Sequence, residues 1–168
     1  MSKKLAVVLV VLLVIAAGAW YAFRPERLFI NQKVNEQFPT VSAANNATTK
    51  ISSGQFHAGA HETKGTATIF KLGDRKRTLR LTNFETSNGP DVHVYLVAAN
   101  DAKDSETVKS AGFVELGSLK GNIGDQNYDV PANVDLDKYR AVTIWCARFN
   151  VNFGTAPLMS DSMQSMNR

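Results

Sequence analysis

The chain has 168 residues and a formal net charge of +4, a length that suits one ordinary domain with accessory segments. Most of the excess positive charge lies within residues 1–27, because residues 28–168 hold 15 Lys and Arg against 14 Asp and Glu. A nearly neutral body excludes a strongly basic nucleic-acid binder, so no nucleic-acid partner is expected. The single cysteine excludes an intramolecular disulfide framework and any cysteine-rich zinc or iron–sulfur site, and no metal site is expected.

An uncharged apolar run covers residues 5–23. As a helix it would be about 28 Å long, close to the roughly 30 Å hydrocarbon core of a bilayer. Lys3 and Lys4 precede the run and favour a cytoplasmic amino end. We therefore expect residues 1–27 to be a signal-anchor that leaves one membrane-anchored, single-pass chain with an extracytoplasmic domain. Ala17-Gly18-Ala19 also fits a signal-peptide cleavage site, and the protein would then be secreted.

The composition predicts two poorly structured segments in the exported part. Residues 28–53 contain few apolar anchors and a polar tract, and we expect them to form a flexible stalk. Residues 159–168 are expected to be a loose carboxy-terminal tail. We expect the segment between them, residues 54–158, to be the folded domain.

Short apolar runs separated by turn residues fill residues 54–158. Val92–Val97 alternates cleanly after the turn cluster Asn88-Gly89-Pro90-Asp91, and Ala141–Phe153 reads as one long alternating run. No stretch shows a sustained helical period. The pattern predicts an all-β fold, an antiparallel β-sandwich or barrel-like domain, preceded by one amino-terminal transmembrane helix and a stalk.

Cys146 is the residue with the most chemical interest. If Ala141–Phe153 is one strand, Cys146 shares a face with Arg148, whose positive charge would stabilise a thiolate and make it available as a redox centre. The alternative is a small buried hydrophobic residue, which is the usual role of a lone cysteine in a strand.

The sequence contains three histidines, His57, His61 and His93. His57 and His61 are four residues apart, but on a strand this separates them by roughly 13 Å, too far to share one ion. If a neighbouring strand places His61 or His93 beside Cys146, that histidine could tune the pKa of the thiol or bind a cofactor such as haem together with it. A hydrogen-bonded structural histidine is the alternative at each position.

A set of motifs spread over residues 54–158 resembles the DM-thirteen domain family, an exported module also found beside DOMON domains. The motifs are Gly54-x-Phe56 with His61 and Gly65, Leu79-x-Leu81-x-x-Phe84, Asn88-Gly89-Pro90-Asp91-x-His93-Val94-Tyr95-Leu96, Leu116-Gly117-x-Leu119-Lys120-Gly121-Asn122, Gly124-Asp125-Gln126-Asn127-Tyr128 with Pro131, and Val142-x-Ile144-Trp145-Cys146-x-x-Phe149-x-Val151-x-Phe153-Gly154-x-Ala156-x-Leu158. The resemblance implies a β-sandwich whose Trp-Cys element works in extracellular electron transfer. It further implies that Cys146 is a bare redox thiol or the attachment point of a prosthetic group such as haem.

Two functional hypotheses follow. In the first, the chain is a membrane-tethered redox or electron-transfer module centred on Cys146, with a redox protein as partner. No enzyme motif for hydrolysis or group transfer is present, and the sequence itself requires no cofactor. In the second, the domain is a non-catalytic adhesion or ligand-binding module whose binding loops are Gly89–Asp91 and Lys120–Asp125.

Overall fold

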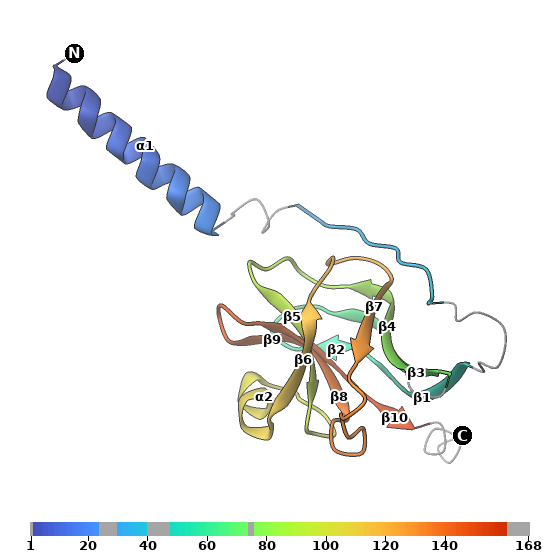
Figure 1. The fold of residues 1–168 in the computed structure, drawn as a ribbon. Coiled ribbons are helices and arrows are strands. Elements are labelled where there is room, and N and C mark those ends of the chain that lie inside the picture. The colour runs from blue at the N-terminus through green and yellow to red at the C-terminus, as the bar shows by residue number, and fades with distance from the viewer. Residues whose placement is uncertain (1, 24–29, 40–47, 74–75, 161–168) are drawn as a thin grey trace.

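The computed structural model describes residues 2–23, 30–39, 48–73 and 76–160, which form one long helix and a β domain (Figure 1). Helix α1 spans Lys3–Phe23, and a short helix, α2, spans Ser105–Ala111 within the domain. The strands are β1 (Thr48–Gln55), β2 (His57–Ala58), β3 (Lys64–Leu72), β4 (Lys76–Glu85), β5 (Val92–Val97), β6 (Phe113–Ser118), β7 (Gln126–Val130), β8 (Ala141–Cys146), β9 (Val151–Pro157) and β10 (Met159–Ser160).

The strands form two antiparallel sheets that face each other. One sheet has the order β10-β1-β3-β4-β7, and the other has the order β2-β9-β8-β5-β6. Apolar side chains from both sheets meet in one buried core between them, as in a β-sandwich. The predicted antiparallel β fold is therefore confirmed, and the two separate sheets make it a sandwich rather than a closed barrel.

Strands β5 and β8 lie side by side in the second sheet and are buried on both faces. Val94 and Ile144 are cross-strand partners that face the main core, whereas Tyr95 and Trp145 belong to a second apolar cluster. That second cluster includes Val108 of α2, so the short helix covers the outer face of this sheet. A sheet covered on both faces needs apolar residues at successive positions, which explains the near-continuous apolar run of β8.

Helix α2 was not expected from the sequence. Asp104 caps it, because its carboxylate accepts a 2.7 Å hydrogen bond from the backbone N–H of Thr107. The helix buries only Val108 fully, so a seven-residue segment with one core position has no repeating apolar pattern to detect. The cap, rather than the periodicity, was the signal in the sequence.

The run Ala141–Phe153 is two strands rather than one, which corrects a second expectation. Strand β8 ends at Cys146, a turn follows, and β9 begins at Val151 and pairs antiparallel with β8. In the turn, Asn150 has a φ of 53°, a left-handed conformation that asparagine tolerates better than most residues. The alternation of the sequence continues through this turn and conceals it.

The folded domain begins before residue 54. Strand β1 starts at Thr48 and pairs with β3 over its whole length, so the last part of the expected stalk is a sheet strand. At the other end, Met159 and Ser160 pair with β1 as strand β10. The rest of the expected tail, residues 161–168, and residues 40–47, which hold most of the polar tract, lie outside the described residues.

Residues 30–39, here called the tether segment, lie along the domain in extended form (Figure 1). The backbone N–H groups of Val34 and Glu36 donate to the carbonyls of Ile123 and Asp125, each at 2.9 Å. The Glu36 carboxylate also binds the Lys120 ammonium at 2.8 Å. This part of the expected stalk is therefore held against the loop between β6 and β7.

Gly124 makes the close approach of the tether segment possible. Its φ is 103°, and an added Cβ would lie 1.9 Å from the carbonyl oxygen of Val34. We expect Gly124→Ala to lower the free energy of unfolding by more than the roughly 1–3 kcal/mol of backbone strain alone, and to release the Val34 amide to hydrogen exchange. Gly112→Ala is the matched control, because Gly112 has a φ of 84° but nothing within 4 Å of the added Cβ. Equal exchange of the Val34 amide in both variants would contradict the packing described here.

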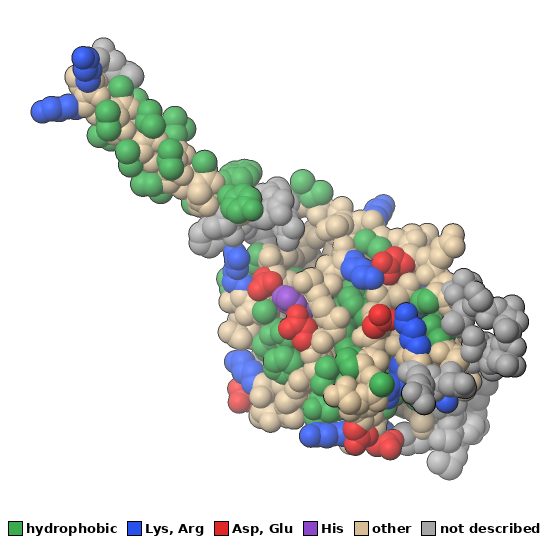
Figure 2. All heavy atoms as spheres, in the orientation of Figure 1, with side chains coloured by type: hydrophobic (Ala, Val, Ile, Leu, Met, Phe, Trp, Pro, Cys, Tyr) green, Lys and Arg blue, Asp and Glu red, His purple; other side chains and the backbone are tan. Residues whose placement is uncertain are grey.

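Helix α1 is long and apolar enough to cross a membrane, although a signal sequence meets the same criterion. Apolar side chains cover it along its length, and the domain shows both signs of charge interspersed over the visible face (Figure 2). Its side chains from Leu5 to Tyr21 are exposed outside the domain core, which is the condition for contact with lipid.

Candidate functional site

Cys146 lies at the end of β8 with its side chain in the main core. It is fully buried and belongs to the apolar cluster between the sheets. Its direct cross-strand partner is Val92 of β5, and side chains of such partners lie about 4.5–5.5 Å apart at Cβ. The thiol is therefore packed against Val92 rather than exposed at the surface.

The structure does not bring the predicted partners of Cys146 to its sulfur. Arg148 is exposed in the turn between β8 and β9. The two residues therefore do not share the face of one strand, as had been expected. His61 lies against the ring of Phe153, with 4.0 Å between the ring centroids. His93 follows Val92 on β5 and therefore points to the opposite face of the sheet from the thiol.

His93 lies between two carboxylates. Its Nε2 is 2.8 Å from Oδ1 of Asp91, and its Nδ1 is 2.7 Å from Oε1 of Glu115 on β6. Partial burial alone would lower the pKa of His93, but the hydrogen bonds and negative charges of both carboxylates hold that pKa above its ordinary value. The arrangement favours the protonated imidazolium, which ties the turn before β5 to β6.

The raised pKa of His93 predicts a pH dependence of stability. A group with a raised folded-state pKa stabilises the fold fully below its unfolded pKa, near 6.5, and this contribution is lost as pH rises through the folded value. We expect the free energy of unfolding to fall over that range, and His93→Gln to flatten the decline in urea unfolding series. His57, whose pKa is also raised by its hydrogen bond to Asp101 despite burial, contributes in the same direction and leaves a residual slope. An unchanged slope in His93→Gln would contradict the assignment.

The residues present do not fit a haem iron or another metal at Cys146. Both ring nitrogens of His93 are engaged by carboxylates, and this residue lies on the opposite face from the thiol. Over the described part of the chain, no group of three or more His, Cys, Asp or Glu side chains could hold a metal ion. His93 and Cys146 therefore do not form a pair of ligands for one haem iron.

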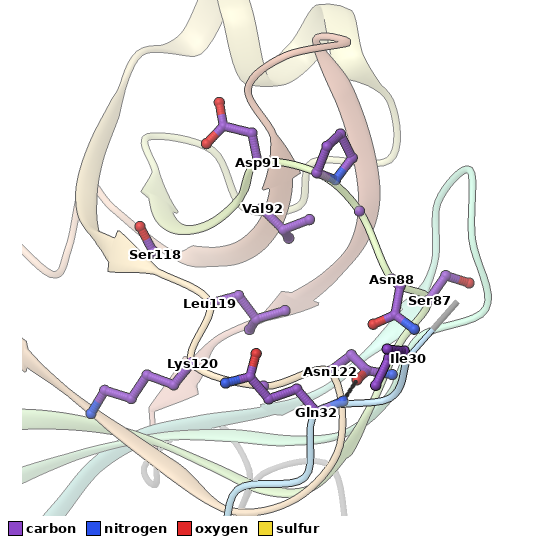
Figure 3. Close-up of a pocket in the computed structure, with 13 residues that line it drawn as sticks. Ile30, Gln32, Ser87, Asn88, Asp91, Val92, Ser118, Leu119, Lys120 and Asn122 are labelled. Carbon is purple, nitrogen blue, oxygen red and sulfur yellow. Dashed lines mark hydrogen bonds between the residues drawn. The ribbon is translucent and has the colours of Figure 1, made fainter. Parts of the chain in front are cut away.

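A cavity of about 350 Å³ opens at the amino-terminal end of β5, with Val92 in its lining (Figure 3). Two loops line it, Ser87–Asp91 before β5 and Ser118–Asn122 after β6, and the tether segment supplies Ile30 and Gln32. The tether is pinned to the second loop by a 2.7 Å hydrogen bond from the Gln32 N–H to the Asn122 side chain. The cavity thus combines segments that are far apart in the sequence.

Val92 links the cavity to Cys146. Its side chain is among those that line the cavity, and it is also the direct cross-strand partner of Cys146. Two backbone bonds fix it in place: its carbonyl accepts from the Leu119 N–H, and the carbonyl of Asp91 accepts from the Ala147 N–H, both at 2.8 Å. The residue opposite Cys146 in the sheet is therefore part of the cavity lining.

The sequence indicated both loops of the cavity but not the tether segment, which is the third part of its lining. The turn cluster Gly89–Asp91 and the glycine-rich stretch after Lys120 were visible as candidate binding loops, and the structure brings them together. The contribution of Ile30 and Gln32 was missed because their segment has the composition of a linker. The glycines at 121 and 124 were the available signal, since an added Cβ at either position would meet the tether backbone.

One comparison with known proteins identifies the domain. The model of a family described as electron transfer DM13 matches residues 55–158, which is more than half of the chain. No curated protein and no solved structure matches the chain. The matched range includes Cys146, both cavity loops and all of β2 to β9. The chain therefore belongs to the electron-transfer DM13 family.

Proposed function

We propose that this chain is a membrane-tethered, extracytoplasmic redox domain in which the thiol of Cys146 is the group that changes oxidation state. The family supports a redox-related role, and α1 could act as an uncleaved signal-anchor. The observation that carries the choice of Cys146 is its register opposite Val92, a residue that lines the cavity.

Burial alone would make Cys146 an inert packing residue, because the thiolate is the reactive form and needs access to its partner. The cavity changes this argument, because Val92 both lines the cavity and is the cross-strand partner of Cys146, so a displacement of Val92 is the route by which a reactant would reach the sulfur. The thiolate would then attack a disulfide of a redox partner protein, break the S–S bond, and form a mixed disulfide while the other partner sulfur leaves as a thiolate. No prosthetic group is required by this chemistry.

The test uses the purified full-length chain in detergent, equilibrated with glutathione couples of different ratio and then quenched with acid. We expect the intact mass to rise by one glutathionyl group as the mixture becomes oxidising, and to return on reduction. Cys146→Ala is the control and removes the only cysteine. A mass change that requires urea would show that the thiol is a core residue without a redox role.

A second candidate function is supported by the cavity itself. Gly89–Asp91 and the first three residues of Lys120–Asp125, the loops expected to bind ligand in an adhesion or binding module, line the same space. In that case Cys146→Ala would leave function intact in cells, whereas substitutions in the loops would abolish it. Comparing Cys146→Ala with the loop substitutions therefore distinguishes the redox function from the binding function.

A further inference from the structure

The cavity beside Val92 has a mixed lining of apolar and polar side chains. Val92 and Leu119 point into it and form an apolar floor, and Gln32 and Asn88 lie around its edge (Figure 3). Among the described residues, neither the side-chain amide of Gln32 nor the hydroxyl of Ser118 has a hydrogen-bond partner. Such a site offers apolar contact to one face of a ligand and hydrogen bonds to its edge.

The two charged residues in the lining are engaged elsewhere. The Lys120 ammonium donates to both Glu36 carboxylate oxygens, at 2.8 and 2.9 Å, and to the Asn127 carbonyl at 2.7 Å. The Asp91 carboxylate accepts from His93. Because Lys120 is paired with Glu36 and one His93 is shared by Asp91 and Glu115, the charged lining residues offer no unpaired positive charge, and an anionic ligand would lose its hydration without a compensating cation.

Size limits the ligand further. A space of about 350 Å³ lies at the small end of the range for ligand sites. We propose that the cavity binds a small uncharged ring that carries hydroxyl groups, with the ring face on Val92 and Leu119 and the hydroxyls toward the Gln32 amide and Ser118. Both a hydroquinone and a monosaccharide have this chemistry.

The tether sets where this binding occurs, and this step rests on the membrane anchor of the proposed function. Only residues 24–29 separate the end of α1 from Ile30, which itself lines the cavity. A fully extended chain from Phe23 to Ile30 spans at most about 25 Å. The cavity is thereby confined to a layer at the membrane surface, where its ligand is taken up.

Binding is tested with the full-length chain in detergent micelles, using hydroquinone, glucose and inorganic phosphate as separate probes. The readout is the backbone amide NMR signals of Gly89 and Gly121, which lie in the two loops. We expect a saturable shift with hydroquinone or with glucose and none with phosphate. A hydroquinone response indicates a membrane-soluble ligand, and a glucose response a water-soluble one. No shift with either hydroquinone or glucose, or a shift with phosphate alone, would overturn the proposal.

Two substitutions in the tether separate a specific site from general surface binding. Gln32→Ala is expected to weaken binding about 2- to 10-fold through loss of one hydrogen bond, whereas Gln37→Ala, which changes an exposed tether residue outside the cavity, leaves it unchanged. Ser118→Trp is expected to fill the space and abolish binding. Equal affinity in all three variants would contradict the site. Cys146→Ala retains binding even if the redox role fails, so the two proposals can be judged separately.

Discussion

Replacing Trp145 with alanine is expected to lower the free energy of unfolding by about 3–5 kcal/mol, a large share of the stability of a domain of this size. Trp145 is almost fully buried between the second sheet and α2, where it packs with Tyr95. Its removal leaves a cavity that the sheet and helix can fill only in part. Urea unfolding followed by circular dichroism measures the loss.

Phe149→Ala is the matched control for this substitution. Phe149 has the same parity as Trp145 in the sequence, but it lies in the turn after β8 with 63% of its surface exposed. Its truncation is expected to change the free energy of unfolding by no more than about 0.5 kcal/mol. A loss as large as that of Trp145→Ala would mean that the strand continues through the turn, as the alternation alone suggests.

Replacing Val92 with alanine is expected to raise the rate at which a maleimide modifies Cys146 in the native protein by about ten-fold or more. Val92 lines the cavity and is the cross-strand partner of Cys146, so on the proposed path its truncation lowers the free energy of local opening, and 1.4 kcal/mol corresponds to a factor of ten. Labelling is followed by intact mass under native conditions.

Val94→Ala is the control for Val92→Ala. Val94 lies two residues along the same face of β5, is fully buried, and does not line the cavity. Both truncations lower global stability, by about 1.5–3 kcal/mol, through lost apolar burial. If the thiol reacts only after global unfolding, labelling follows stability and Val94→Ala accelerates it at least as much. Faster labelling in Val92→Ala alone indicates a local path through the cavity.

The fold class was predictable because each half-buried strand carries its own alternating pattern. Val92–Val97 was identified with its bounds, since turn residues flank it and its two faces differ. The break after Cys146 was not predictable, because the residues of the turn continue the alternation. Helix α2 was not predicted because it contributes one fully buried side chain, Val108, to a cluster formed mainly by the sheet.

The candidate site was predictable in its parts but not in its assembly. Cys146 and the loop at Gly89–Asp91 were both singled out, yet nothing local in the sequence indicates that Val92 links them. That relation depends on the register of β5 with β8, a contact between residues far apart in the chain. The expected pairing of Arg148 with the thiol failed for a local reason, because it assumed one strand where β8 ends at Cys146 and a turn follows.

The oxidation state of Cys146 in native membranes tests the redox role most directly. Membranes from cells that make the protein are divided, held under oxidising or reducing conditions, quenched with acid, unfolded and alkylated with a maleimide before intact-mass analysis. The redox role predicts that alkylation of Cys146 is blocked in part of the oxidised sample and fully recovered in the reduced one. Complete alkylation in both samples would contradict it and leave Cys146 as a packing residue of the core.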